Sequence, residues 1–211
     1  MYLCAQNQPK CAFLMSITVT KTRDILVDVA RQLFARMGFD NTTMNDIAQA
    51  SQKGRRTLYT YFKSKADIFS AVIESEMEQM QHQLQEIVHS ELPSDEKLIG
   101  FLYTRLDAIK LIVSRNGTLR AAFFRDMWRV EKARKKFNTQ EPRLIKTILD
   151  EGVNKGIFEI PDTEATAYII HYALKGLEVP YIRGKIGKSD ADREKHKTNV
   201  MNFIFNGIKI K

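Results

Sequence analysis

The fold of the first part of this chain depends on the stretch Thr43-Met-Asn-Asp-Ile-Ala-Gln-Ala-Ser-Gln-Lys-Gly-Arg-Arg-Thr-Leu-Tyr-Thr-Tyr-Phe62. Thr43 and Asp46 have the spacing of a capping box, which predicts a short helix from Met44 to about Ala50. After a tight connection, the pattern predicts a second short helix over residues 55–62, with Gly54 able to serve as its N-cap. We therefore expect two short helices joined by a tight turn.

The two faces of these short helices differ in chemistry. Ile47 and Ala48 give the first helix an apolar side, and Leu58 and Phe62 give the second helix its own. The outward positions of the second helix carry long donors, hydroxyls and aromatic rings: Arg55, Arg56, Thr57, Tyr59, Thr60 and Tyr61. A major groove accepts one helix of this kind while a short preceding helix braces it across the backbone. The stretch therefore predicts a helix-turn-helix that binds double-stranded DNA.

Helical periodicity continues on both sides of this stretch. Before it, an apolar stripe from Leu26 to Met37 ends at Gly38 and predicts a helix over about 22–37. After it, Ser64 and Asp67 repeat the capping-box spacing and open a longer helix. Further helices are predicted over 95–115, 118–137, 142–155, 163–178 and about 190–208, with Pro180 ending or kinking the penultimate one. Strand patterns are almost absent, so the predicted fold class is all-α with about nine helices.

Charge is unevenly distributed along the 211 residues, whose net charge is +8. Residues 1–70 carry ten Lys/Arg against five Asp/Glu, whereas residues 71–211 carry 23 against 20. A basic first third fits a nucleic-acid module attached to another domain, although many other proteins are mildly basic. The only cysteines are Cys4 and Cys11, and no run of about 18 apolar residues is present. We expect a cytoplasmic protein with no membrane partner.

Two segments of the sequence resemble a known family. The segments Thr42-Thr-Met-Asn-Asp-Ile-Ala-Gln-Ala and Thr57-Leu-Tyr-Thr-Tyr-Phe-Lys-Ser-Lys-Ala-Asp-Ile-Phe69 are similar to the N-terminal domain of the TetR family of bacterial transcriptional regulators. The preceding helix, with Ala30, Phe34 and Gly38, is similar too, so the resemblance covers residues 22–75. Residues 151–158 resemble the end of that family's seventh helix more weakly. The resemblance implies a homodimer, a palindromic operator and a C-terminal helical domain with an inducer pocket.

The resemblance also implies roles for individual side chains. Arg55 and Arg56 match base-contacting positions, where an arginine bound bidentately to a guanine edge contributes roughly 1–3 kcal/mol of discrimination. The positions that match phosphate contacts are Thr43, Tyr59, Thr60, Tyr61 and Lys65. An alternative for Tyr59 is that its ring packs against the preceding helix. Thr57 and Lys53 complete the predicted DNA-binding set.

The turn between the two short helices departs from the family pattern. Members usually have Ala-Gly-Val-Ser there, whereas this chain has Ser51-Gln52-Lys53-Gly54. Lys53 cannot bury its ammonium cheaply, so the side chain must extend to solvent or point at DNA. The resemblance therefore defines neither the geometry of this turn nor the full set of residues that face the bases.

The domain organisation follows from the resemblance. We expect a mobile N-terminal extension over 1–20, a three-helix helix-turn-helix domain over 21–66, and a larger helical domain for ligand binding and dimerisation over 67–211. The last helix has an apolar stripe consisting of Val200, Phe203, Ile204, Gly207 and Ile208. Its expected partners on the 163–178 helix are Ala167, Ile170, Tyr172 (or His171) and Leu174. A homodimer through these last two helices would place two recognition helices about 34–36 Å apart, but both stripes could instead be buried within one subunit.

A ligand pocket is predicted from the aromatic residues of the larger domain. Its candidate residues are Phe101, Tyr103, Phe123, Phe124, Met127, Trp128, Tyr168 and Tyr172. Each of these residues could equally be plain core, although an apolar ligand cavity would have to be built from such side chains.

The predicted function is a ligand-responsive transcriptional regulator, a repressor by family habit. The alternative is a DNA-bound adaptor whose C-terminal domain docks a protein partner instead of a small-molecule inducer. The sequence has no Gly-rich phosphate loop, nucleophile elbow or metal-ligand cluster, so we expect neither an enzyme nor a metal site nor a cofactor.

Overall fold

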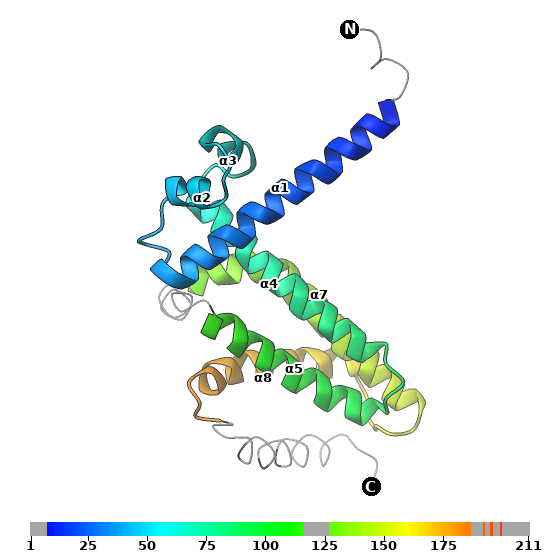
Figure 1. Cartoon of the computed structure of the whole chain (residues 1–211). Helices are drawn as coiled ribbons and strands as arrows, with labels where there is room; N and C mark the ends of the chain where they lie inside the picture. The colour runs from blue at the N-terminus through cyan, green and yellow to red at the C-terminus, as the bar shows by residue number, and fades with distance from the viewer. Residues whose placement is uncertain (1–7, 116–126, 187–191, 193–194, 196–198, 200–211) are drawn as a thin grey trace. The chain divides into compact units, whose positions relative to one another are not determined.

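Most of the chain that the structure describes is helical. The computed structural model describes residues 8–115 and 127–186, together with residues 192, 195 and 199. The helices within these residues are α1 (Gln8–Met37), α2 (Met44–Ala50), α3 (Arg55–Tyr61), α4 (Lys65–Val88), α5 (Ser94–Arg115), α7 (Met127–Asn154) and α8 (Thr163–Ile182) (Figure 1). The all-α prediction is confirmed. The helix predicted over 190–208 lies almost entirely outside the described residues.

The chain divides into two compact units, and the division falls inside α4 between Ile73 and Glu74. Of the described residues, the first unit contains those up to Ile73, and the second contains those from Glu74 on. The predicted domain boundary after residue 66 stays a prediction, as does the mobility of residues 1–20.

The first unit is built on α1. The helix buries Leu26, Ala30 and Phe34 on one face. It ends at Gly38, whose φ of 96° lies in the left-handed region that favours glycine and whose amide donates to the Phe34 carbonyl at 3.1 Å. α1 begins at Gln8, earlier than the predicted residue 22. Pro9 falls in the first turn, where its missing N–H costs little, and no glycine or proline follows it before residue 38.

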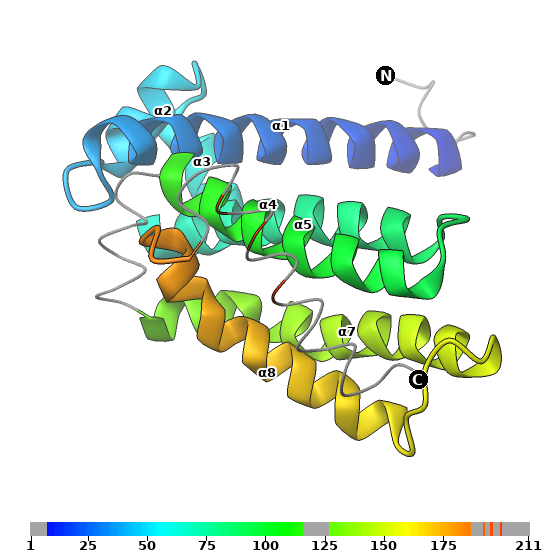
Figure 2. The same ribbon diagram turned by 90° about the horizontal axis from the view of Figure 1, so that it is seen from below.

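The second unit is held together by α7 packing against α8, with α5 packing against both (Figure 2). Apolar side chains from all three helices fill its core, among them Leu98, Phe101, Ile145, Ile148 and Leu174.

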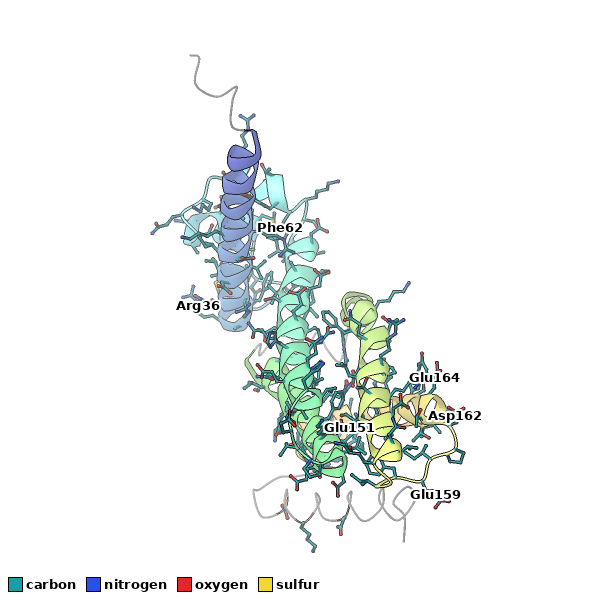
Figure 3. All side chains as sticks on the ribbon, turned by 90° about the vertical axis from the view of Figure 1, so that its right-hand side faces the viewer. Arg36, Phe62, Glu151, Glu159, Asp162 and Glu164 are labelled. Atoms are coloured by element: carbon teal, nitrogen blue, oxygen red, sulfur yellow. The ribbon has the colours of Figure 1, made fainter. Side chains whose placement is uncertain are left out.

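Polar contacts at helix ends fix the connections within the second unit. The Lys97 ammonium on α5 donates to Glu151 on α7 at 2.8 Å. At the start of α8 the Thr163 hydroxyl donates to Asp150 at 2.6 Å, and Asp162 caps the helix by accepting from the Ala165 amide at 2.9 Å. Figure 3 shows Asp162, Glu159 and Glu164 near the connection between α7 and α8. These contacts pair the end of α7 with the start of α8.

Two predicted helix boundaries are wrong. The segments 118–137 and 142–155 were predicted as separate helices, but α7 runs without a break from Met127 through Pro142 to Asn154. A proline inside a helix costs about 3 kcal/mol or more. Phe137, Ile145 and Ile148 are buried on both sides of it, and their burial offsets that cost. α8 likewise continues through Pro180 to Ile182 instead of ending near residue 178.

Candidate nucleic-acid interface

The start of α2 is fixed by a capping box. The Thr43 hydroxyl accepts from the Asp46 amide at 3.2 Å, and the Asp46 carboxylate accepts from the Thr43 amide at 2.8 Å. The Thr43 hydroxyl also donates to the same carboxylate at 2.8 Å. These bonds from Thr43 hold the pKa of Asp46 below its ordinary value. The predicted capping box is confirmed, and the Thr43 hydroxyl proton is already used within the chain.

The turn between α2 and α3 contains a non-glycine residue in the left-handed region. Gln52 has a φ of 54°, at the position where the family usually has glycine. The Ser51 hydroxyl donates to the Ala48 carbonyl at 3.1 Å, and the Lys53 amide donates to the same carbonyl at 3.1 Å. Gly54 is the N-cap of α3, as predicted, and its carbonyl accepts from the Leu58 amide. The unusual turn therefore still closes tightly.

α3 has one buried face and one outward face. Leu58 and Phe62 are buried as predicted, and the Arg23 guanidinium from α1 lies 5.6 Å from the centre of the Phe62 ring. Figure 3 shows Phe62 beside α1. The outward residues are Arg55, Arg56, Tyr59 and Thr60, all exposed, and Thr57 and Tyr61, both half-buried.

The surroundings of Tyr59 and Thr60 bear on their predicted roles as phosphate contacts. The Tyr59 side chain is 45% exposed, so its ring is not enclosed against α2. The Thr60 hydroxyl donates to the Arg56 carbonyl at 2.9 Å and must rotate before it can donate to a phosphate.

Lys65, another predicted phosphate contact, donates to a loop of the protein that is distant in the sequence. Its ammonium donates to the Phe39 carbonyl at 2.5 Å and to the Asp40 carbonyl at 3.2 Å. Neither contact was visible from the sequence pattern, because 25 residues separate Lys65 from this loop.

The outward surface of this region is strongly basic. Residues 47–66 contain Lys53, Arg55, Arg56, Lys63 and Lys65 and no aspartate or glutamate. Arg55 and Arg56 are exposed at the N-terminal end of α3, where a recognition helix contacts base edges. A short bracing helix, a closed turn and a helix with an exposed arginine pair are the parts that a helix-turn-helix needs.

Comparison with known proteins identifies the family. Residues 26–72 match the family model described as bacterial regulatory proteins, tetR family. The HTH-type transcriptional repressor KstR2 of Rhodococcus jostii is 30% identical over 142 residues, which cover 64% of this chain and 67% of that protein. The chain belongs to the TetR family.

Solved structures extend the likeness in fold to most of the chain. A transcriptional regulator from Cytophaga hutchinsonii has a TM-score of 0.70 and 23% identity, over 89% of this chain and 98% of the other. The ketosteroid transcriptional regulator KstR2 of Mycobacterium tuberculosis has a TM-score of 0.56 and 19% identity, over 90% and 95% respectively. In this TetR-family chain, as in those structures, an N-terminal helix-turn-helix is followed by a helical C-terminal domain.

The predicted pocket residues of this TetR-family chain lie in different surroundings. Phe101 is fully buried and Tyr103 half-buried, whereas Tyr168 and Tyr172 are exposed on α8. Phe123 and Phe124 lie outside the described residues, and the side chains of Met127 and Trp128 are not described. The predicted pocket stays a prediction.

A surface groove of about 550 Å³ lies between α4 and α5. Its lining residues are Gln83, Glu86, Ile87, Ser90, Leu92, Thr104, Asp107, Ala108 and Leu111. None of them belongs to the aromatic set predicted from the sequence. No helix within residues 8–115 and 127–186 is long and apolar enough to cross a membrane.

The second unit also contains a buried group of charges that the sequence analysis missed. This ionic cluster consists of Arg105 on α5, Arg134 and Glu141 on α7, and His171 and Glu178 on α8. Arg105 donates to Glu141, and it donates to Glu178 at 2.7 Å; Arg134 also donates to Glu178 at 2.7 Å. His171 Nδ1 lies 3.5 Å from a Glu141 oxygen.

Ion pairing outweighs burial at both glutamates of the ionic cluster. Burial raises the pKa of Glu178, but the hydrogen bonds and charges of Arg134 and Arg105 lower it by more, so the pKa lies below its ordinary value. Burial also raises the pKa of Glu141, and His171 and Arg105 together lower it by more. Both carboxylates are therefore held in the ionised form.

Proposed function

We propose that this chain is a ligand-responsive transcriptional repressor that binds a palindromic operator as a homodimer. The observation that carries the proposal is the exposed pair Arg55 and Arg56 at the start of α3, on a helix whose other face is buried. Two guanidiniums in this position can each donate bidentately to the edge of a guanine. Membership of the TetR family supports the same assignment.

The other predicted DNA contacts would position the recognition helix on the duplex. Phosphate contacts fix register and orientation and add a salt-dependent affinity that is independent of base sequence. The residues we propose for this work are Thr43, Lys53, Thr57, Tyr59, Thr60 and Tyr61. Lys65 is left out of this set, because its ammonium donates to two carbonyls of the protein.

The exposed face of α8 supports the proposed homodimer. An apolar stripe follows the helix at positions three and four residues apart and is exposed in the single chain: Ala165, Tyr168, Ile169, Tyr172, Ala173 and Gly176. Ala167 and Leu174, which the sequence suggested for the interface, are instead buried within the second unit. An exposed apolar stripe of this kind is typical of a surface that a second protein covers. A second copy of α8 related by two-fold symmetry is the occupant we propose.

Ligand control would act by shifting a population of conformations. The dimer would have two states, one whose recognition helices fit the operator spacing and one whose recognition helices do not. A ligand that binds the second state more tightly reduces the affinity for DNA, by an amount set by its difference in affinity for the two states. The names of two relatives, a transcriptional repressor and a ketosteroid transcriptional regulator, support repression and an apolar ligand. We place the protein in the cytoplasm, where the operator is.

The adaptor alternative also has an observation in its favour. Leu92 and Leu111 are exposed apolar residues at the α4–α5 groove and do not belong to the apolar stripe of α8. A protein partner could cover them in place of a small molecule inside the domain.

Selection from random double-stranded DNA tests the proposal. The wild-type protein should enrich two inverted half-sites whose centres are about one helical turn, roughly 34–36 Å, apart. Sedimentation should give a dimer on each enriched duplex. Enrichment of no sequence, or of a single half-site by a monomer, would refute the proposal. A screen for apolar compounds that raise the melting temperature and weaken operator binding then separates the inducer model from the adaptor model.

A further inference from the structure

Lys65 at the first residue of α4 makes three contacts with one short loop. Its ammonium donates to the carbonyls of Phe39 and Asp40 at 2.5 and 3.2 Å. The same nitrogen lies 4.4 Å from the centre of the Phe39 ring. A lysine ammonium has three N–H donors; two of them serve the carbonyls, and the aromatic ring lies against the same nitrogen. Little of its donor capacity is left for a phosphate.

The contacted loop, residues 38–43, leads directly into α2. Several bonds hold it against α1: the Asn41 amide donates to the Met37 carbonyl at 3.0 Å, and the Thr42 hydroxyl donates to the Gly38 carbonyl at 2.6 Å. The Phe39 ring lies 5.5 Å from the Phe34 ring and 5.0 Å from the Phe69 ring. Lys65 is therefore the hydrogen-bonding link between the start of α4 and the segment that places α2.

We propose that Lys65 is a positioning residue that holds the 38–43 loop, and through it the start of α2, and that it does not bind a phosphate. The inference rests on the proposed DNA-binding function. Without the ammonium, two loop carbonyls lose a charged donor, and the loop must be ordered again each time the protein binds an operator. Two other basic residues, Lys53 and Lys63, remain to neutralise phosphates in this region.

The salt dependence of operator binding separates the two roles of Lys65. Lys65→Met should reduce operator affinity about tenfold or more, which is what the loss of one charge-assisted hydrogen bond amounts to. The slope of log K against log salt concentration should stay at the wild-type value. If Lys65 instead neutralised a phosphate, the slope would become shallower by about 0.9 per subunit, or about 1.8 per dimer. That shallower slope would overturn the proposal.

Hydrogen exchange of the free protein tests the positioning itself. In Lys65→Met, amides of residues 38–47 should exchange at least about tenfold faster, because the loop opens more often. The amides of α5 and α8 should keep their wild-type rates, which excludes general unfolding. Lys63→Met is the matched control: Lys63 is exposed two residues away, so its loss removes the same charge without touching the loop. Faster exchange of the loop in both variants, or in neither, contradicts the proposal.

Acetylation of lysines in the wild-type protein gives a test that needs no variant to fold. With sulfo-N-hydroxysuccinimide acetate and free protein, Lys65 should react at least about tenfold more slowly than Lys63, because its ammonium is engaged by two carbonyls. Operator DNA should add little further protection at Lys65. Equal rates in the free protein, followed by protection of Lys65 on DNA, would refute the proposal. Failure of the wild type to select any DNA sequence would refute the proposed function instead, and the labelling rates would still report on the contact.

Discussion

Gly152, near the end of α7, lies directly against the ring of Phe158. A Cβ placed on Gly152 would lie 2.1 Å from the Cδ2 atom of that ring. The amides of Ile157 and Phe158 donate to the Gly152 carbonyl at 2.8 and 3.1 Å, and Gly156, with a φ of 67°, lets the chain turn back. The residues that follow α7 thus cap its C-terminal end. Residue 152 must be a glycine because the Phe158 ring occupies the place of a Cβ atom.

Gly152→Ala should therefore destabilise the protein even though alanine is the better helix former. Alanine gains about 1 kcal/mol in a helix interior, whereas forcing a methyl into a packed site costs typically about 1–3 kcal/mol. Because the added methyl would lie 2.1 Å from the Phe158 ring, the cost of the clash exceeds the gain in helix propensity. Urea unfolding should show a net loss of stability. Gly100→Ala in α5 is the control, since its nearest neighbour would be Ile87 at an ordinary 3.7 Å; this change should stabilise.

Glu178→Gln should destabilise the second unit by about 3–5 kcal/mol at pH 7, because two buried guanidiniums lose their shared carboxylate. The folded-state pKa of Glu178 lies below the unfolded value, so its ionised form stabilises the fold above about pH 4.5. That contribution is lost as the pH falls through the folded pKa. Chemical unfolding from pH 7 to pH 3 should give a flatter acid limb for the variant than for wild type.

Glu164→Gln is the matched control for this change. Glu164 is exposed in the first turn of α8 (Figure 3) and is not a member of the ionic cluster. Its substitution should shift stability by less than about 1 kcal/mol and leave the acid limb unchanged. Equal acid limbs for wild type and Glu178→Gln would contradict the role assigned to the ionic cluster.

Gln52→Gly should stabilise the turn between α2 and α3. A left-handed backbone costs an L-residue roughly 1–2 kcal/mol, and glycine removes this cost while losing about 0.5–1 kcal/mol of unfolded-chain entropy. The expected net gain is up to about 1 kcal/mol in thermal or urea unfolding. Gln49→Gly, three residues earlier in α2, should have the opposite sign, because Gln49 is in a helix. A loss of stability in Gln52→Gly would show that the Gln52 side chain makes a contact worth more than the strain.

Arg55→Ala should relax the sequence preference of DNA binding. One base position per half-site should lose about 1–3 kcal/mol of discrimination, while binding to non-specific DNA weakens only modestly. The measurement is a comparison of operator variants by fluorescence anisotropy at fixed salt. Arg36→Ala removes the same charge from an exposed position on α1, outside the helix-turn-helix, and should keep the full discrimination (Figure 3).

Ile169→Glu should dissociate the proposed dimer. Ile169 is 68% exposed in the single chain, at the centre of the apolar stripe on α8. A charge buried at the centre of an interface should cost about 2 kcal/mol or more, measurable as a rise in the dimer dissociation constant in sedimentation equilibrium. Leu111→Glu on α5 changes a residue that is also exposed, at 46%, but does not belong to the apolar stripe of α8. The dimer should survive that second change.

Local rules account for much of this fold. Capping boxes at Thr43 and Ser64 fix where α2 and α4 begin, and Gly38 ends α1, because each of these signals acts within a few residues of the backbone that it shapes. The arrangement of α2, the turn and α3 could likewise be predicted, since apolar positions such as Ile47 and Leu58 have one helical face to fill.

Features that depend on distant partners could not be predicted in the same way. The predicted break between residues 137 and 142 is one example, because Pro142 lies inside α7 and the buried side chains that offset its local cost pack against other helices. Lys65 matched a phosphate-binding position, but its acceptors lie in a loop 25 residues earlier. Arg105 stands at a core position of the α5 stripe, and only the fold brings Glu178 to it. The only sign of the ionic cluster in the sequence of α5 was a charged residue, Arg105, at a position where the helical pattern calls for an apolar one.

The ionic cluster also constrains how the second unit can move. An apolar core lets one helix slide a little along another, since methyl groups attract in every direction, but a guanidinium and a carboxylate bond only when aligned. Glu178 serves two arginines at once, so a shift of α8 by one helical turn, about 5.4 Å, would break both bonds together. We expect α8 to occupy discrete positions along the helices it packs against, with no stable position between them. Any signal that displaces it must therefore exceed a threshold.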